Sequence, residues 1–177
     1  MARLQPTHRS PWNAIYVKPR HEKNVANHLR GKGFDPFVPT YKSQRVRSSE
    51  LPLFPCYVFC RVDPENRLPI LTVPCVFFIV GIGKTPAAIE ESEVAALKTV
   101  VASGCRVQPW QYMKAGDRVR IDGGPLRGVE GFFQRTHAES QLIVSVTLLQ
   151  RSVAVSLESN WVIPASTSTP RTLSAGA

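Results

Sequence analysis

Hydrophobic and polar positions in the first hundred residues follow two different periods. Residues 12–17 (Trp-Asn-Ala-Ile-Tyr-Val) are rich in β-formers and predict a strand. From Glu22 onward, apolar residues recur three and four positions apart, and Gly31 and Gly33 follow, which predicts a helix that ends there. The chain therefore opens with a strand and a helix.

The same reading predicts the following elements of the first half: an extended Pro-rich segment over 34–41, a polar basic loop over 42–49, an apolar run ending in a strand over 51–62, a short helix over 67–72, a strand over 76–80, and a helix from about 90 to 102. Helices and strands thus alternate over about 95 residues. This alternation favours an α/β sandwich, in which helices flank a sheet.

The second half has a different pattern, because its apolar segments alternate or are β-branched and carry no helix signal. Residues 119–121 form a short alternating strand that runs into Asp122-Gly-Gly-Pro125, a sequence typical of a tight reversal. Gly128 and Gly131 mark a second turn, and residues 142–149 and 152–157 are strand-like. Such frequent reversals predict a small, strongly curved β-barrel.

These patterns predict an α+β chain with two domains. The first, an antiparallel sheet flanked by helices, spans 11–103, and the barrel spans 114–164. Residues 104–113 have neither period and are expected to be a linker. Residues 165–177 are low in complexity and are expected to be disordered.

The charge of the chain indicates a polyanionic partner. The formal net charge of the 177 residues is +9, and the first fifty hold ten Lys or Arg residues against three acids, or +7 of that total. A concentrated basic face is typical of nucleic-acid binding. The alternative is a basic surface that only keeps the protein in solution.

Candidate catalytic and metal-binding chemistry is sparse. Cys56, Cys60, Cys75 and Cys105 form no CxxC pair and have no His at ligand spacing, so we expect no zinc. The four His residues and the scattered acids match no catalytic pattern, and we expect neither an enzyme nor a cofactor. No apolar run has signal-peptide or transmembrane length, so we expect a cytoplasmic protein with reduced thiols and no membrane contact.

Two sets of motifs resemble one known family. The sequence Gly-Asp-Arg-Val-Arg-Ile (116–121), followed by Gly-Pro-Leu-Arg-Gly-Val-Glu-Gly (124–131), is similar to the KOW motif of the NusG family of transcription elongation factors. Segments of the first half resemble the NusG N-terminal domain in the matching order: Trp12 with Tyr16, Glu22-Lys-Asn-Val25 with Leu29, Leu53-Phe-Pro-Cys-Tyr-Val-Phe59, Val73-Pro-Cys-Val76 with Ile79-Val-Gly81, and Glu93-Val94 with Leu97. The resemblance covers residues 11 to 164 and implies that the barrel is an SH3-like KOW domain.

The resemblance implies that the first domain binds a coiled coil of the largest RNA polymerase subunit, and that residues 67–72 touch the other large subunit. The matching polymerase-binding residues are Tyr16, Phe54, Pro55, Tyr57, Phe59 and Thr72. Strand alternation puts Tyr57 and Phe59 on one face and Val58 and Cys60 on the other, and leaves open which face is core. The family favours Tyr57 and Phe59 as the exposed pair.

The resemblance also implies two further binding surfaces. Residues that would face upstream or non-template DNA are Lys18, Arg20, His21, His28, Arg45 and Arg47. Positions in the KOW domain that would recruit a small-subunit ribosomal protein or the termination factor Rho are Val129, Leu148, Leu149 and Arg151. Adjacent strand residues point to opposite faces, so Leu148 and Leu149 cannot both be core unless a bulge intervenes.

The function implied is that of a monomeric transcription elongation factor that modulates pausing, termination or antitermination. Cys56 stands where general members of the family commonly have Gly, and the leucines at 148 and 149 replace bulkier residues, which favours a specialised paralogue acting on selected operons. The alternative is a KOW-containing, ribosome-associated RNA-binding protein. Such a protein would not need the Phe54-Pro55-Cys-Tyr57 segment.

Overall fold

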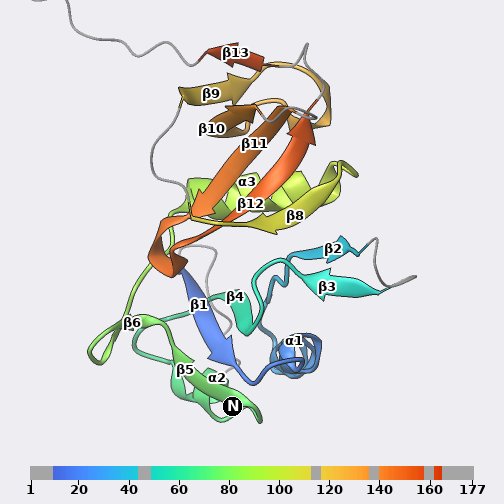
Figure 1. Ribbon diagram of the computed structural model, residues 1–177. Helices are drawn as coiled ribbons and strands as arrows, with labels where there is room; N and C mark the ends of the chain where they lie inside the picture. Colours follow the sequence, from blue (N-terminus) through green and yellow to red (C-terminus); the bar gives the residue numbers. More distant parts are fainter. Residues whose placement is uncertain (1–9, 44–48, 113–116, 136–139, 158–161, 165–177) are drawn as a thin grey trace, which may run out of the picture.

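The computed structural model describes residues 10–43, 49–112, 117–135, 140–157 and 162–164 (Figure 1). It is a mixed α/β fold with few helices and several sheets. The elements of the first half are β1 (Trp12–Val17), α1 (Glu22–Gly31), β2 (Thr40–Lys42), β3 (Glu50–Pro52), β4 (Tyr57–Arg61), α2 (Leu68–Leu71), β5 (Val76–Ile79), β6 (Gly81–Ile82), β7 (Thr85–Pro86) and α3 (Glu91–Ala102). Those of the second half are β8 (Val107–Trp110), β9 (Asp117–Ile121), the 3-10 helix η1 (Gly124–Leu126), β10 (Glu130–Arg135), β11 (Ser140–Val146), the 3-10 helix η2 (Thr147–Leu149), β12 (Arg151–Leu157) and β13 (Val162–Pro164).

A three-stranded antiparallel sheet, in the order β4-β1-β5, forms the centre of the first half. One of its faces packs against α1 and α2, where Ile15 and Val17 meet Val25, Leu29 and Ile70 in a buried cluster. The buried positions of α1 have the predicted helical spacing, and the predictions of β1, α1, α2, β5 and α3 are confirmed. The sequence pattern of this half therefore places most of its elements correctly.

Cys60 lies on this helix-covered face and is fully buried. Burial, with a smaller contribution from the charge of Asp35, raises the pKa of its thiol to about 12. The thiol sulfur also lies 3.6 Å from the backbone carbonyl oxygen of Arg61. Cys60 therefore behaves as a small hydrophobic residue rather than a reactive one.

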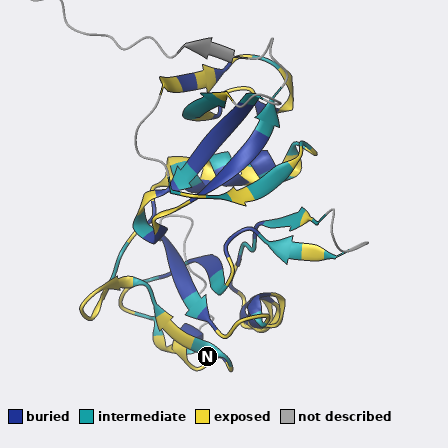
Figure 2. Cartoon of the chain, in the orientation of Figure 1, coloured by how far each residue is buried: buried dark blue, intermediate teal, exposed yellow. Residues whose placement is uncertain are grey.

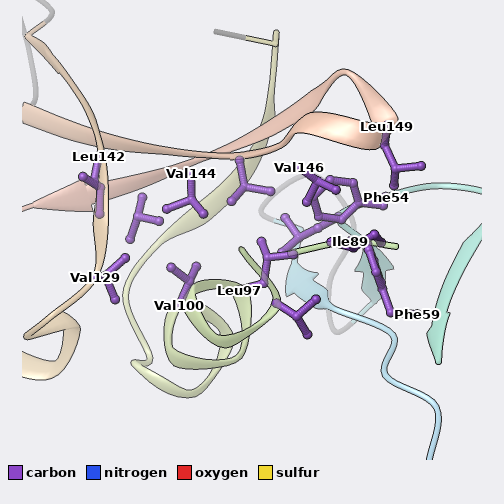
Figure 3. Packing of buried hydrophobic residues seen from close by; sticks show 14 of the residues in the cluster. Phe54, Phe59, Ile89, Leu97, Val100, Val129, Leu142, Val144, Val146 and Leu149 are labelled. Atoms are coloured by element: carbon purple, nitrogen blue, oxygen red, sulfur yellow. The ribbon is translucent and has the colours of Figure 1, made fainter. Parts of the chain in front are cut away.

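The opposite face of the sheet shares a core with the second half of the chain. Ala14 and Phe59 belong to the same buried cluster as Leu97 of α3 and Val144 and Val146 of β11 (Figure 3). Helix α3 lies behind β11 and β12 in Figure 1, although its sequence precedes the predicted linker. The two predicted domains are thus packed against each other through one continuous hydrophobic core.

The second half forms a six-stranded antiparallel sheet in the order β13-β9-β10-β11-β12-β8. Its central strands are dark blue in Figure 2, and Leu142, Val144, Val146, Val153 and Val155 face the shared core. Within the described residues β13 and β8 are the two ends of this order and are not paired with each other, so the sheet is not closed. The closed SH3-like barrel stays a prediction.

Two local expectations for this half are wrong. Residues 107–110 were expected to lie in an irregular linker, but they form β8, which pairs with β12 from Trp110↔Ser152 to Val107↔Val155. The run predicted as one strand to Leu149 ends at Val146 and continues as η2, with Gln150 in a left-handed conformation at φ 50°. Both differences arise because tertiary pairing and turn geometry override the local pattern.

The glycine-rich reversal between β9 and β10 is confirmed. Gly124 (φ 66°) and Gly128 (φ 86°) both adopt the left-handed conformation, and the N–H of Gly128 donates to the carbonyl of Ile121 at 2.7 Å. The expectation that Gly131 marks a second turn is wrong, because it lies within β10. There β10 pairs so closely with β11 that a Cβ atom on Gly131 would overlap the carbonyl oxygen of Ile143.

Several predicted features lie outside the described residues, namely Arg45, Arg47 and the tail 165–177. Within the part of the chain that the structure describes, no helix is long and apolar enough to cross a membrane.

Substitution of Gly131 by Ala tests the close approach of β10 and β11. We expect a loss of about 1–3 kcal/mol in the free energy of unfolding, because the added methyl group must displace backbone. Gly31→Ala is the matched control, since no heavy atom lies within 4 Å of a Cβ at that position. Denaturant titrations of both variants measure the difference, and equal stabilities would contradict the packing of this sheet.

Alkylation with iodoacetamide tests the burial of Cys60. With a pKa of about 12, only about 0.1% of the thiol is ionised at pH 9, and the thiolate is the nucleophile. We expect Cys60 to stay unmodified in the folded protein from neutral pH to about pH 9 and to react once the protein is unfolded. Peptide mass spectrometry reads out each site, and labelling of Cys60 as fast as the half-buried Cys105 would contradict the structure.

Candidate functional site

Aromatic side chains gather where β1 ends and β4 and β5 begin. The ring of Tyr16 lies 5.4 Å from that of Tyr57 in an edge-on arrangement, 5.0 Å from Phe78 in a stacked one, and 5.8 Å from Phe77. Phe77 and Phe78 are 57% and 51% exposed. We call Tyr16, Tyr57, Phe77 and Phe78 the aromatic surface, and its exposure is typical of a protein-binding site.

Phe77 and Phe78 were not identified from the sequence as site residues. Residues 76–80 predicted a strand, but nothing in the spacing showed that this strand would lie at the edge of a three-stranded sheet. The available signal was the pair of adjacent aromatic residues in a strand next to one that carries Tyr16.

A tight turn over Phe54-Pro55-Cys56-Tyr57 positions the next part of the site. The N–H of Tyr57 donates to the carbonyl of Phe54 at 3.1 Å, and Cys56 has a φ of 70°. The buried carboxylate of Glu22 accepts a hydrogen bond from the Cys56 N–H at 2.8 Å, and the Cys56 carbonyl accepts one from Val17 at 2.9 Å. Pro55 is exposed at the outer corner of this turn.

The expected exposure of Phe54 and Phe59 is wrong in this structure. They are 1% and 0% exposed, and their rings lie 5.4 Å apart in an edge-on arrangement within the shared core. Tyr57 and Phe59 do share one face, as alternation predicted, but both faces of β4 are covered, one by α1 and the other by the second half of the chain. Whether Phe54 and Phe59 contact a partner stays a prediction.

Residues of the second half cover this face. Leu149 lies next to Phe54 in Figure 3 and is 9% exposed, and the guanidinium carbon of Arg151 lies 5.6 Å from the centre of the Tyr57 ring. Leu148 packs against the same cluster and is half-buried, whereas Val129 is 4% exposed and belongs to the core. The predicted polymerase-binding and partner-recruiting sites therefore meet each other, and the expectation that Val129 and Leu149 lie on an open surface is wrong here.

Polar contacts tie α3 to both sheets. The Glu91 carboxylate accepts hydrogen bonds from Arg61 at 2.7 Å and 2.9 Å and from the Trp12 indole N–H at 3.2 Å. The Lys98 ammonium lies 4.5 Å from the centre of the Trp12 ring, which adds a cation–π contact. On the other side, the Glu93 carboxylate accepts a hydrogen bond from the N–H of Thr147 in η2 at 3.1 Å.

The predicted nucleic-acid residues that the structure describes lie on the turn between β1 and α1 and on α1 itself. Lys18 and Arg20 are exposed in the turn, His21 precedes the helix, and His28 is exposed two turns later. Thr72 lies elsewhere, at the end of α2, where its hydroxyl accepts a hydrogen bond from Lys32 at 2.9 Å. The structure therefore brings the basic set together but separates Thr72 from the aromatic surface.

A cavity of about 670 Å³ lies between α3 and the second sheet. Its lining includes Ala95, Ala96 and Thr99 on the helix and Arg118 and Arg127 on the sheet side. Each arginine is near a carboxylate, since Arg118 lies 3.7 Å from Glu130 and Arg127 lies 4.0 Å from Asp122. Among the described residues, no group of three or more His, Cys, Asp or Glu side chains could hold a metal ion.

Comparison with known proteins identifies relatives of this chain. Residues 10–98 match the family model described as "Transcription termination factor nusG". The proteins named "Transcription termination/antitermination protein NusG" from Helicobacter pylori strains 26695 and J99 are each 23% identical over 146 residues, which is 76% of this chain and 83% of theirs. The solved structure "Domain interaction in Thermotoga maritima NusG" matches with a TM-score of 0.56 at 20% identity, covering 89% of this chain and 98% of that one, which shows a common fold.

Proposed function

The chain belongs to the NusG family of transcription termination and antitermination factors, and we propose that it is an elongation factor that binds RNA polymerase through the aromatic surface. The observation that carries this proposal is the exposed group of rings around Tyr16 at the rim of an otherwise buried sheet. Aromatic anchors of this kind bind amphipathic partner helices by filling pockets and excluding water. The family resemblance names that helix as part of a coiled coil in the largest polymerase subunit.

If polymerase contacts Phe54 and the whole of Tyr57 as well as the exposed rings, the second half of the chain must move. Leu149 lies next to Phe54 and Arg151 lies over the ring of Tyr57, so this arrangement is a closed state with respect to Phe54 and Tyr57. A polymerase that binds only the uncovered site shifts the chain toward an open state by mass action. The contacts that cover the site thus reduce the apparent affinity of the chain for polymerase, although the binding residues themselves are unchanged.

We propose that the second half, once released, recruits a further partner. In the family the KOW domain binds a small-subunit ribosomal protein or Rho, and the matching positions are Val129, Leu148, Leu149 and Arg151. Because three of these residues now contact or approach the face of the first half, release for polymerase also frees them for that partner. The KOW-like glycine reversal with its two left-handed glycines supports this assignment of the second half.

The basic turn after β1 supports a supplementary role in binding upstream or non-template DNA. Lys18 and Arg20 are exposed there, with His21 and His28 on the adjoining helix. Contacts of this kind act through phosphate attraction and weaken with salt. We propose that this chain acts by binding and not by catalysis.

Cys56 supports the proposal of a specialised paralogue. Its φ of 70° is a conformation in which Gly is unstrained and a side chain is disfavoured by about 1–2 kcal/mol. General members of the family commonly carry Gly at the matching position. This chain has a conformationally less favourable residue there, in the turn that includes Pro55.

Co-sedimentation of the full chain with core RNA polymerase tests the proposed function. We expect wild type to bind, Tyr57→Ala to bind at least about tenfold more weakly, and Tyr57→Phe, which keeps the ring, to bind like wild type. Tyr57→Ala also removes the contact with Arg151, which favours the open state. That cation–π contact contributes only about 0.5–1 kcal/mol, less than the binding energy lost when an aromatic anchor is removed from the polymerase interface. The net effect is therefore weaker binding.

Equal binding of wild type and Tyr57→Ala would contradict the role of the aromatic surface. Absence of polymerase binding, combined with binding to ribosomal RNA, would favour the alternative of a ribosome-associated protein.

A further inference from the structure

The exposed large hydrophobic residues of the described chain are concentrated in one short region. Leu68, Leu71, Phe77, Phe78 and Ile82 are between 36% and 84% exposed, and all lie within residues 68–82. The two aromatic residues among them, Phe77 and Phe78, contact the ring of Tyr16. They are therefore continuous with the aromatic surface, whereas Ile82 lies beyond it in the β6–β7 hairpin.

A β-bulge gives these two residues an unusual arrangement. Strand β5 pairs with β1 as Ile15↔Ile79, Tyr16↔Phe78 and Val17↔Val76, so Phe77 is an extra residue opposite the Tyr16–Val17 step. In a regular strand adjacent side chains point to opposite faces. Here both rings lie within 6 Å of Tyr16, as a bulge that redirects one side chain allows.

We propose that Phe77 and Phe78 are the first point of contact for the polymerase helix, which reaches them before the second half is displaced. The inference rests on the proposed function and adds an order of events to it, in which these two residues of the aromatic surface are bound first. Bulges that redirect side chains are over-represented next to functional sites. Without a partner, two half-exposed phenylalanines leave apolar area in contact with water at a cost to the free protein.

Accessibility sets the order of contact. Phe54 and Phe59 are 1% and 0% exposed, so a partner cannot touch them in the closed state, in which Leu149 lies next to Phe54. Tyr57 is partly covered by Arg151. Phe77 and Phe78 are open in the same structure, so they can be bound in the closed state, and the energy gained there lowers the cost of displacing η2 and β12.

The charged residues near Phe77 and Phe78 indicate which kind of partner helix would bind there. Lys18 is exposed beside the start of β5, since its N–H donates to the carbonyl of Cys75 at 2.9 Å. Lys84 is exposed in the hairpin after β5, and its carbonyl accepts a hydrogen bond from Arg67 at 2.6 Å. Exposed lysines therefore occur on the segment that contacts the start of β5 and on the hairpin that follows its end. The complementary partner is a helix with an apolar ridge and acidic residues on either side of it.

The test is the association rate of the full chain with immobilised core RNA polymerase, measured by biolayer interferometry. The variant is F77A/F78A, and the control is Ile82→Ala, which removes a more exposed hydrophobic residue from outside the aromatic surface. Because Phe77 and Phe78 are exposed, the double variant is expected to keep the melting temperature of wild type within a few degrees. We expect its association rate to fall by about tenfold and that of Ile82→Ala to stay unchanged.

Each other outcome overturns the inference in a distinct way. If wild type binds and the double variant associates and dissociates like it, Phe77 and Phe78 are not binding residues, and the proposed function then depends on Tyr16 and Tyr57 of the aromatic surface. If only dissociation accelerates, the two residues bind polymerase but are not reached first. If wild type fails to bind, the proposed function fails together with this inference.

Discussion

Helix α3 is held by both halves of the chain, and the closed arrangement depends on it. Its apolar residues Leu97 and Val100 pack with β11 and η1, whereas Glu91 and Lys98 contact Trp12 on β1. Burying an aliphatic side chain of this size contributes about 1.5–3 kcal/mol, while a partly exposed ion pair such as Glu91–Arg61 contributes about 0.2–1 kcal/mol. The apolar contacts of the shared core therefore contribute more to holding α3 than its polar contacts do.

Contacts of these two kinds cover the predicted polymerase-binding and partner-recruiting surfaces, and a partner that competes for the apolar contacts can expose both surfaces again. The contacts between the halves combine a shared hydrophobic core with a few polar links, such as Glu93 to the Thr147 N–H and Arg151 to the Tyr57 ring. A partner that buries the aromatic surface competes for the same apolar area. The closed state needs only a few kcal/mol in its favour to suppress the open one, and binding of a partner can supply that amount.

Much of the first half could be predicted from its sequence, because its elements carry strong local signals. The period of α1 and the β-formers of β1 each specify a local conformation that the structure contains. In the second half, the glycines at 124 and 128 do the same for the turn between β9 and β10. Whether the site residues are buried or exposed could not be predicted in this way. Phe54 is buried next to Leu149 of the second half, and Phe59 is buried between Phe37 and Phe54. Both depend on tertiary packing, and alternation alone left both faces of β4 possible.

The features that sequence reasoning missed share a tertiary origin. Strand β8 forms because β12 offers an unpaired edge, and no period in residues 104–113 shows this. The bulge at Phe77 depends on how β5 pairs with β1. The end of β11 at Val146 depends on the turn into β12, where Gln150 takes a positive φ that the apolar run before it does not signal.

The most direct test of the account is the separation of the two halves with and without polymerase. Labels introduced through non-natural amino acids at the exposed positions Lys23 in α1 and Asp122 before η1 would report it by single-molecule energy transfer in the full chain. We predict one compact population in the free protein and a longer separation when core RNA polymerase is saturating. An unchanged separation in the polymerase complex would contradict this prediction, because Leu149 and Arg151 would then still lie against Phe54 and Tyr57.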